Sequence, residues 1–256
     1  MPRVINDGIS IHYRVEGKGL TLVLEHGFSD SSETWYELGY VEALRAKYRL
    51  ILIDARGHGQ SDKPHDPPSY APENFATDIV AVLDDLSVRV AAYWGYSQGG
   101  FMGLAMARHA PERVACLVIG GASASAASAY PTEVGKEDPL ITALRGGPDA
   151  LAKVWGVWLT SPLRERLHAN DTDALLACRR QRLITEGFAD VGRIATPALV
   201  YAGSADPIHD AAQQTASELP TAQFTSLPGL NHVDAMCRSD LVLAHVEPFL
   251  ARAMGQ

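Results

Sequence analysis

The fold is decided by residues 90–100, which read Val-Ala-Ala-Tyr-Trp-Gly-Tyr-Ser-Gln-Gly-Gly. The apolar first half of this stretch predicts a buried strand, and a helical pattern follows over residues 98–109. Glycines two residues before and two residues after Ser97 form a G-x-S-x-G pattern at the junction. A serine in this setting is typical of a tight strand-to-helix turn that exposes a nucleophilic hydroxyl. We therefore expect Ser97 to be a catalytic nucleophile.

Short apolar runs alternate with helical patterns along the rest of the chain. This alternation predicts an α/β fold with a mostly parallel central β-sheet and helices on both faces. A hairpin is expected at the start, with residues 6–8 as the turn between strands at 3–5 and 9–15. Further strands are predicted at residues 21–24, 50–53, 88–94, 115–119, 198–201 and 223–227. Helices are predicted at residues 31–47, 74–86, 98–109, 210–219 and 238–254.

Residues 122–196 interrupt this alternation, because they contain no predicted strand. The interval opens with a tract of small residues, and helices are predicted in it at 149–159, 162–169 and 172–187. We expect residues 1–121 and 197–256 to form one core domain and residues 122–196 to form a helical lid inserted in it. A separate domain is the alternative, although roughly 75 residues is small for an independent core.

The composition narrows the class of protein. A net charge of −8 and a pI near 5.6 argue against a nucleic-acid partner. The chain contains no run of apolar residues long enough for a transmembrane helix, and its first residues lack the apolar core of a signal peptide. Cys116, Cys178 and Cys237 are widely spaced, as expected for free thiols in a reducing cytoplasm. A cytoplasmic protein without a membrane partner is therefore expected, and its oligomeric state stays open.

A serine nucleophile needs a base, which is usually a histidine, and an acid that orients the base. Behind an elbow of this kind the chain order is serine, then acid, then histidine. Three late histidines qualify by position. His232 is the expected base because it follows the last predicted strand in a loop. His245 lies inside a helical pattern, and His209 lies three residues from the expected acid.

The expected acid is Asp206, which follows the strand that ends at Tyr201. Ligands of an open α/β sheet bind at this carboxyl edge of the strands. The loop after the strand at 115–119 offers no carboxylate. Asp210 and Asp234 are the competitors, and a solvated loop charge or helix cap explains Asp234 more simply.

Two backbone N–H groups are expected to form an oxyanion hole, which stabilises negative charge in the transition state. One belongs to Gln98, directly after the nucleophile. The other belongs to Phe28, in the loop His26-Gly27-Phe28 after an early strand. His26 is expected to have a structural role within this loop.

The motifs in this order resemble the α/β-hydrolase fold family over nearly the whole chain. They comprise residues 26–28, the elbow, the pair Asp206 and His232, and residues 54–62, which read Asp-Ala-Arg-Gly-His-Gly-Gln-Ser-Asp. The last stretch is similar to the family's loop after its fourth strand, which shapes a wall of the site. Glu25 departs from the family pattern, because a neutral apolar residue is usual there. Pairing with an arginine is its expected role, and tuning of the site is the alternative.

The resemblance extends to small-lidded members such as enol-lactone hydrolases, carboxylesterases and carbon–carbon bond hydrolases. It implies a serine hydrolase without cofactor or metal that acts on a small ester or lactone. Haloalkane dehalogenases and epoxide hydrolases need an aspartate where this chain has Ser97, which argues against both. Carbon–carbon bond hydrolysis, perhydrolysis and acyl transfer are alternatives that use the same residues. A non-catalytic ligand-binding protein is a further alternative.

Aromatic residues are candidates for the substrate pocket. Trp155 and Trp158 are three positions apart and are expected on one helix face, where they either pack the lid onto the core or line the pocket. Trp94 is a weaker candidate. The lid also contains several arginines, which either attract an anionic substrate or form a solvated face. They are Arg164, Arg166, Arg179, Arg180 and Arg182.

Overall fold

The structure is a computed structural model that describes residues 2–125, 137–155 and 161–255. Eight strands form one sheet in the order β1-β2-β4-β3-β5-β6-β7-β8. The pairs β1–β2 and β2–β4 are antiparallel, and all other neighbours are parallel. The strands are β1 (Arg3–Asn6), β2 (Ile9–Glu16), β3 (Leu20–Glu25), β4 (Tyr48–Ile53), β5 (Ala91–Tyr96), β6 (Val114–Gly120), β7 (Ala198–Gly203) and β8 (Ala222–Leu227).

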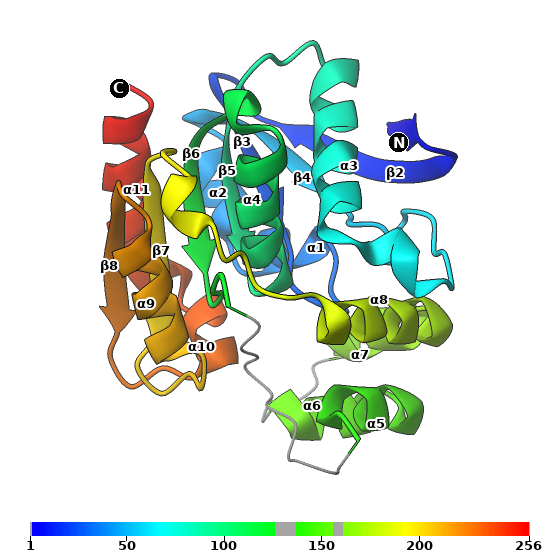
Figure 1. Cartoon of the computed structure of the whole chain (residues 1–256). Coiled ribbons are helices and arrows are strands. Elements are labelled where there is room, and N and C mark those ends of the chain that lie inside the picture. The colour runs from blue at the N-terminus through cyan, green and yellow to red at the C-terminus, as the bar shows by residue number, and fades with distance from the viewer. Residues whose placement is uncertain (1, 126–136, 156–160, 256) are drawn as a thin grey trace.

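Helices cover both faces of the sheet (Figure 1). On one face, Phe75, Leu104 and Ala212 of α3, α4 and α9 pack in one core cluster. On the other, Tyr40 and Val246 of α2 and α11 pack in a second cluster. The helices in the core are α1 (Glu33–Glu37), α2 (Tyr40–Leu44), α3 (Pro72–Asp85), α4 (Gln98–His109), α9 (His209–Glu218), α10 (His232–Cys237) and α11 (Ser239–Ala253). Short 3₁₀ turns are η1 (Pro67–Tyr70), η2 (Pro111–Arg113) and η3 (Val191–Arg193).

The predicted strands and the helices α3, α4, α9 and α11 are confirmed within a few residues. The single helix predicted at 31–47 is wrong, because the chain forms two short helices there. Gly39 separates them with φ of +80°, a left-handed conformation that glycine adopts without strain. The loop predicted around His232 is also wrong, since His232 is the first residue of α10.

Four helices lie at the end of the sheet toward which the arrowheads of β6 and β8 point (Figure 1). They are α5 (Pro139–Gly146), α6 (Pro148–Trp155), α7 (Ser161–Ala169) and α8 (Thr172–Ile184). The helix α5 was not among the predicted elements. Leucines of these four helices form a third apolar cluster, and Phe28 of the core packs against it. The cluster therefore continues into the loop after β3.

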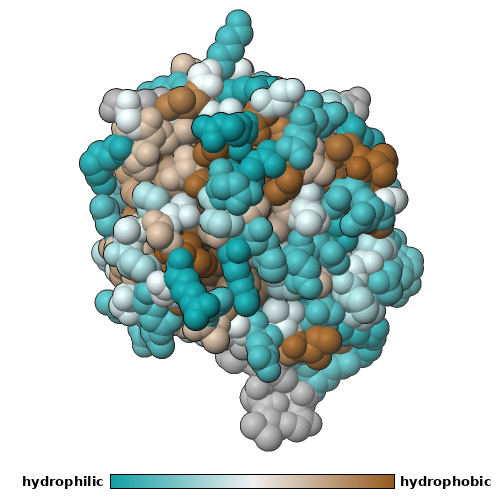
Figure 2. All heavy atoms as spheres, turned by 45° about the horizontal axis from the view of Figure 1, so that its top comes forward, coloured by the Kyte–Doolittle hydropathy of each residue, from teal (hydrophilic) through white to brown (hydrophobic). Residues whose placement is uncertain are grey.

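Figure 2 shows the molecule turned so that the top of Figure 1 comes forward. On this face, apolar residues form separate patches among hydrophilic ones. Among the described residues, no helix combines the length and the apolar character needed to cross a membrane.

Candidate active site

Ser97 lies at the turn between β5 and α4 with φ of 54° and ψ of −115°, a conformation that side-chain-bearing residues rarely adopt. Two glycines make this turn sterically feasible. A Cβ on Gly95 would lie 2.2 Å from the carbonyl carbon of Gly99, and a Cβ on Gly99 would lie 2.3 Å from the carbonyl oxygen of Glu25. The G-x-S-x-G spacing therefore follows from close backbone packing on both sides of the serine.

The structure brings Ser97, His232 and Asp206 together. Nδ1 of His232 lies 2.7 Å from Oδ2 of Asp206, and Nε2 lies 3.0 Å from Oγ of Ser97. A carboxylate is an acceptor, so it favours the tautomer with the proton on Nδ1. Nε2 can then accept a proton from the serine hydroxyl.

Both partners of Ser97 are held by backbone contacts. Asp206 follows β7, is 4% exposed, and accepts a hydrogen bond from the backbone N–H of Ile208 through Oδ1. His232 begins α10, where the side chain of Asn231 caps the helix by accepting from the backbone N–H groups of residues 233 and 234. Tyr96 donates a hydrogen bond to the carbonyl oxygen of His232. These contacts fix the imidazole before any substrate arrives.

Phe28 and Gln98, the residues expected to form an oxyanion hole, lie on the loop after β3 and at the start of α4. A Cβ on Gly27 would be 3.5 Å from Cβ of Ser97, so the loop after β3 passes close to the serine. In the described ranges neither the N–H of Phe28 nor that of Gln98 donates a hydrogen bond. His26 has both ring nitrogens engaged, with Gly27 O and the N–H of Ala55, which confirms its structural role.

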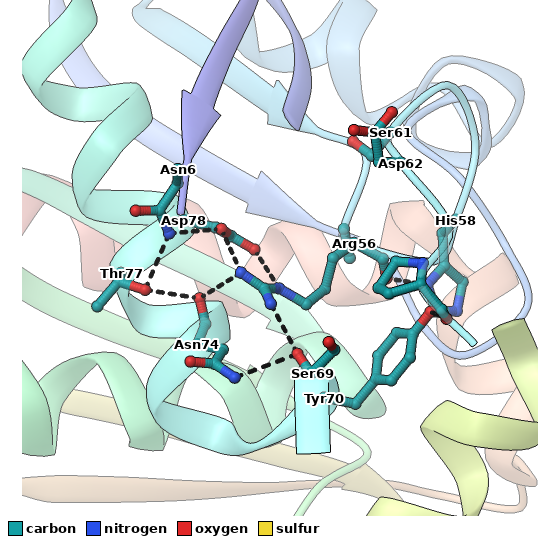
Figure 3. Close-up of polar contacts among 12 residues, drawn as sticks. Asn6, Arg56, His58, Ser61, Asp62, Ser69, Tyr70, Asn74, Thr77 and Asp78 are labelled. Atoms are coloured by element: carbon teal, nitrogen blue, oxygen red, sulfur yellow. Dashed lines mark hydrogen bonds and ion pairs between the residues drawn. The ribbon is translucent and has the colours of Figure 1, made fainter. Parts of the chain in front are cut away.

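The loop after β4 forms a polar network beside the site (Figure 3). Arg56 donates to both carboxylate oxygens of Asp78 on α3, at 2.6 and 2.7 Å, and to the carbonyl of Ser69 at 2.7 Å. Both side chains of the ion pair are 4% exposed. Burial raises the pKa of Asp78, although the Arg56 guanidinium acts in the opposite direction. The pair ties the predicted wall of the site to α3.

Asp54 is the second polar centre of this loop. It accepts hydrogen bonds from the N–H groups of Ser32 and Gln60, and one oxygen lies 2.9 Å from Nδ1 of His12. Burial alone would raise the pKa of Asp54. These hydrogen bonds outweigh burial and hold the pKa well below its usual range.

Glu25 has no arginine partner in the described structure, so the expected pairing is wrong. Its carboxyl is 2% exposed and contacts the hydroxyl of Tyr93, with 2.8 Å between Oε2 and Oη. Burial raises its pKa to about 8.

The tryptophans expected at the pocket differ in position. Trp94 is fully buried against Trp35 and Tyr40 inside the core, which removes it from the pocket candidates. Trp155 ends α6 and packs against the apolar cluster of the four helices. Trp158 lies outside the described residues.

The sequence did not predict two contacts of this helical segment with the site. Sγ of Cys178 on α8 lies 3.5 Å from Oε1 of Gln98, and the amide of Asn170 donates to the carbonyl of Ser29 at 2.8 Å. Short-range patterns carry no signal for either contact, because the partners are 80 and 141 residues apart.

Four of the five arginines singled out between residues 122 and 196 have a nearby partner. Arg179 forms a buried ion pair with Asp138, Arg164 pairs with Asp149, and Arg166 contacts Glu37. Arg182 lies 4.0 Å from the ring centroid of Phe101. This local pairing disfavours a general role for the cluster in attracting an anion.

A second serine–histidine contact lies on the surface. Nε2 of His209 is 2.9 Å from Oγ of Ser226, and Nδ1 is 3.0 Å from Oδ1 of Asp210. The Asp210 side chain is fully exposed. Ser226 lies within β8, whereas Ser97 directly precedes α4, whose first N–H groups can serve as oxyanion donors. The group at Ser97 is therefore the better candidate.

Known proteins share the fold of this chain. The sequence profile described as alpha/beta hydrolase fold matches residues 21–145. The chain has the α/β-hydrolase fold. Among solved structures of this fold, the enol-lactonase from Burkholderia xenovorans LB400 has a TM-score of 0.83 and 24% identity, covering 98% of this chain and 100% of that chain.

Curated α/β-hydrolase relatives include different activities. The 3-oxoadipate enol-lactonase 2 of Acinetobacter baylyi is 25% identical over 210 residues, or 78% of this chain and 77% of that protein. Bifunctional epoxide hydrolase 2 of Mus musculus is 36% identical over 112 residues, or 43% of this chain and 20% of that protein. Several of these matches are partial, and three of them span between 20% and 42% of the relative's own length.

Proposed function

We propose that the protein is a serine hydrolase that cleaves a small carboxylic ester or lactone. The observation that carries this proposal is the contact series from Asp206 to Nδ1 of His232 and from Nε2 to Oγ of Ser97, at 2.7 and 3.0 Å. A serine with an oriented imidazole base is the arrangement that acyl transfer requires.

In the proposed mechanism, His232 removes the proton of Ser97 as Oγ attacks the substrate carbonyl. The tetrahedral oxyanion accepts hydrogen bonds from the N–H groups of Phe28 and Gln98. Asp206 stabilises the imidazolium, which then protonates the leaving alcohol oxygen. Water attacks the acyl-enzyme with His232 again as base, and the acid is released while Ser97 regains its proton.

The likeness to the Acinetobacter enol-lactonase supports a lactone or ester substrate. The chain is also similar to an epoxide hydrolase, but the residue at position 97 argues against that activity. Opening an epoxide through an ester intermediate needs a carboxylate nucleophile, and this chain has the hydroxyl of Ser97 there. We therefore favour acyl chemistry.

We further propose that residues 122–196 form a lid inserted in the core of residues 1–121 and 197–256. The contacts that support this role are Cys178 with Gln98, Asn170 with the carbonyl of Ser29, and the leucine cluster with Phe28. All three lie beside the proposed oxyanion hole, so the lid would shape the substrate-binding side of the site.

The test is steady-state hydrolysis of a short-chain aryl ester and of a small lactone by Ser97→Ala and Ser226→Ala. The second variant is the matched control, because Ser226 also contacts a histidine. We expect kcat to fall at least about a thousandfold in Ser97→Ala and to change less than about twofold in the control. Full activity of Ser97→Ala would refute the proposal.

A further inference from the structure

Glu25 is a buried carboxyl group that the proposed mechanism does not use. It ends β3 and directly precedes residues 26–28, which we call the oxyanion loop. In the described part of the chain, its side chain has one polar partner, the hydroxyl of Tyr93, and no lysine or arginine pairs with it. An ionised carboxylate in this environment would lack the compensation that a buried charge needs.

The hydroxyl of Tyr93 lies between two oxygen atoms. Oη is 2.8 Å from Oε2 of Glu25 and 2.8 Å from the carbonyl oxygen of Gly99. A phenol has one proton to donate, and a carbonyl oxygen can only accept. Both contacts are hydrogen bonds at once when Glu25 is protonated, donates to Oη, and leaves the Tyr93 proton for Gly99. The geometry therefore favours the neutral acid.

On balance, the surroundings of Glu25 also favour its protonated form. Burial raises the pKa of Glu25 to about 8, the hydrogen bond with Tyr93 lowers it, and the charge of Asp78 raises it. Asp78 lies on α3 and is paired with Arg56. His26, the next residue along the chain, has both ring nitrogens engaged in hydrogen bonds. The group that α4 presents to the hydroxyl of Tyr93 is the backbone carbonyl of Gly99.

The chain Glu25–Tyr93–Gly99 connects the oxyanion loop with the turn that carries Ser97. The space for it depends on glycine, because a Cβ on Gly103 would lie 2.6 Å from the ring of Tyr93. The Tyr93 ring therefore lies directly against α4, and its hydroxyl reaches the first turn of that helix.

We propose that neutral Glu25 is a positioning residue for Ser97, donating to Tyr93, which in turn donates to the Gly99 carbonyl and holds the nucleophile turn against the oxyanion loop. The role in catalysis rests on the proposed function. When Glu25 loses its proton, Tyr93 must donate to the carboxylate, and the Gly99 carbonyl loses this donor. The new negative charge also lies next to the loop that binds the oxyanion, so the transition state is destabilised.

The experiment compares kcat and KM for a short-chain aryl ester from about pH 6 to about pH 10 in the wild type, Glu25→Gln and Glu25→Leu. Glu16→Gln is the matched control, because Glu16 also contacts a tyrosine hydroxyl, with 3.0 Å between its Oε1 and Oη of Tyr36. Glu16 has no role in the proposed mechanism. A glutamine amide donates to Tyr93 at every pH in this range. We expect the wild type and the control to lose kcat as pH rises through about 8, and Glu25→Gln to lack this loss.

Glu25→Leu should lower kcat about tenfold at neutral pH with KM nearly unchanged, because Glu25 does not touch the substrate. An alkaline loss of kcat in Glu25→Gln equal to that of the wild type would overturn the proposal. So would a change confined to KM.

A second measurement is independent of activity. In a Ser97→Ala background, the Tm of the chain with Glu25 should fall relative to that with Glu25→Gln as pH rises from about 4.5 to about 8. The folded state keeps a proton in this window that the unfolded state has released. A Tm difference that does not change with pH would overturn the proposal that Glu25 is neutral. Full activity of Ser97→Ala would instead refute the proposed function.

Discussion

Nε2 of His232 lies 3.0 Å from Oγ of Ser97, although 135 positions separate the two residues along the chain. The parallel sheet produces this contact. Ser97 follows the central strand β5 directly, and His232 begins α10, the helix that follows β8. Asp206 follows β7 between them, so three strand ends supply three side chains to one edge of the sheet.

Asp206→Asn tests the acid of the proposed mechanism. The amide offers no charge to stabilise the imidazolium and favours the wrong histidine tautomer, so kcat should fall about 10⁴-fold while KM changes little. Asp210→Asn and Asp234→Asn are controls, and both should keep activity within about twofold. Loss of activity in either control with an active Asp206→Asn would show that the acid is misassigned.

Gly95→Ala tests the packing of the elbow. Its Cβ would meet the carbonyl carbon and oxygen of Gly99 at 2.2 Å, and the atoms that would have to shift belong to the backbone. We expect the free energy of unfolding to fall by about 3 kcal/mol or more. Gly39→Ala is the control, because its Cβ would meet nothing within 4 Å and the cost is the left-handed φ alone, about 1 kcal/mol. Urea unfolding measures both, and equal losses would contradict the close-packed elbow.

Breaking the buried pair of Arg56 and Asp78 should lower the free energy of unfolding much more than breaking a surface pair. Asp78→Asn leaves the guanidinium buried without its counter-charge, so the free energy of unfolding should fall by about 3–5 kcal/mol. In the exposed pair of Arg45 and Glu42, Glu42→Gln should cost less than about 1 kcal/mol. Denaturant titration distinguishes the two, and a small loss in Asp78→Asn would show that the network does not hold the loop.

Asp54 predicts a dependence of stability on pH. Its pKa is lowered from the ordinary value of 3.8 in the folded state, so its contribution is present above about pH 4 and lost as pH falls further. Asp54→Asn should therefore be much less stable than the wild type at pH 7, and the gap should narrow in acid. Asp210→Asn, with a fully exposed side chain, should stay within about 0.5 kcal/mol of the wild type. A gap that stays constant down to about pH 2 would contradict the lowered pKa.

The sequence predicted the parts of this fold that depend on local pattern. Continuous apolar runs marked the buried strands, and the order of serine, acid and histidine selected Asp206 and His232. The helix at 31–47 failed because periodicity alone did not reveal that Gly39 would adopt a left-handed φ. The loop around His232 failed although Asn231, a strong helix-capping residue, was visible in the sequence.

Long-range contacts were beyond local patterns. Glu25 and Tyr93 are 68 residues apart, and their contact arises because β3 and β5 are neighbours in the sheet. From sequence alone the carboxyl was expected to pair with an arginine. Trp94 was expected near the pocket, but the strand turns its side chain to the core face that carries Trp35.

The central claim is that Ser97 is the activated nucleophile. The most direct measurement is covalent labelling with a serine-reactive phosphonate, followed by peptide mass spectrometry, in the wild type, Ser97→Ala and Ser226→Ala. We predict one adduct on the peptide containing Ser97 in the wild type and in Ser226→Ala, and none in Ser97→Ala. An unlabelled wild type, or equal labelling of Ser97→Ala, would contradict the claim.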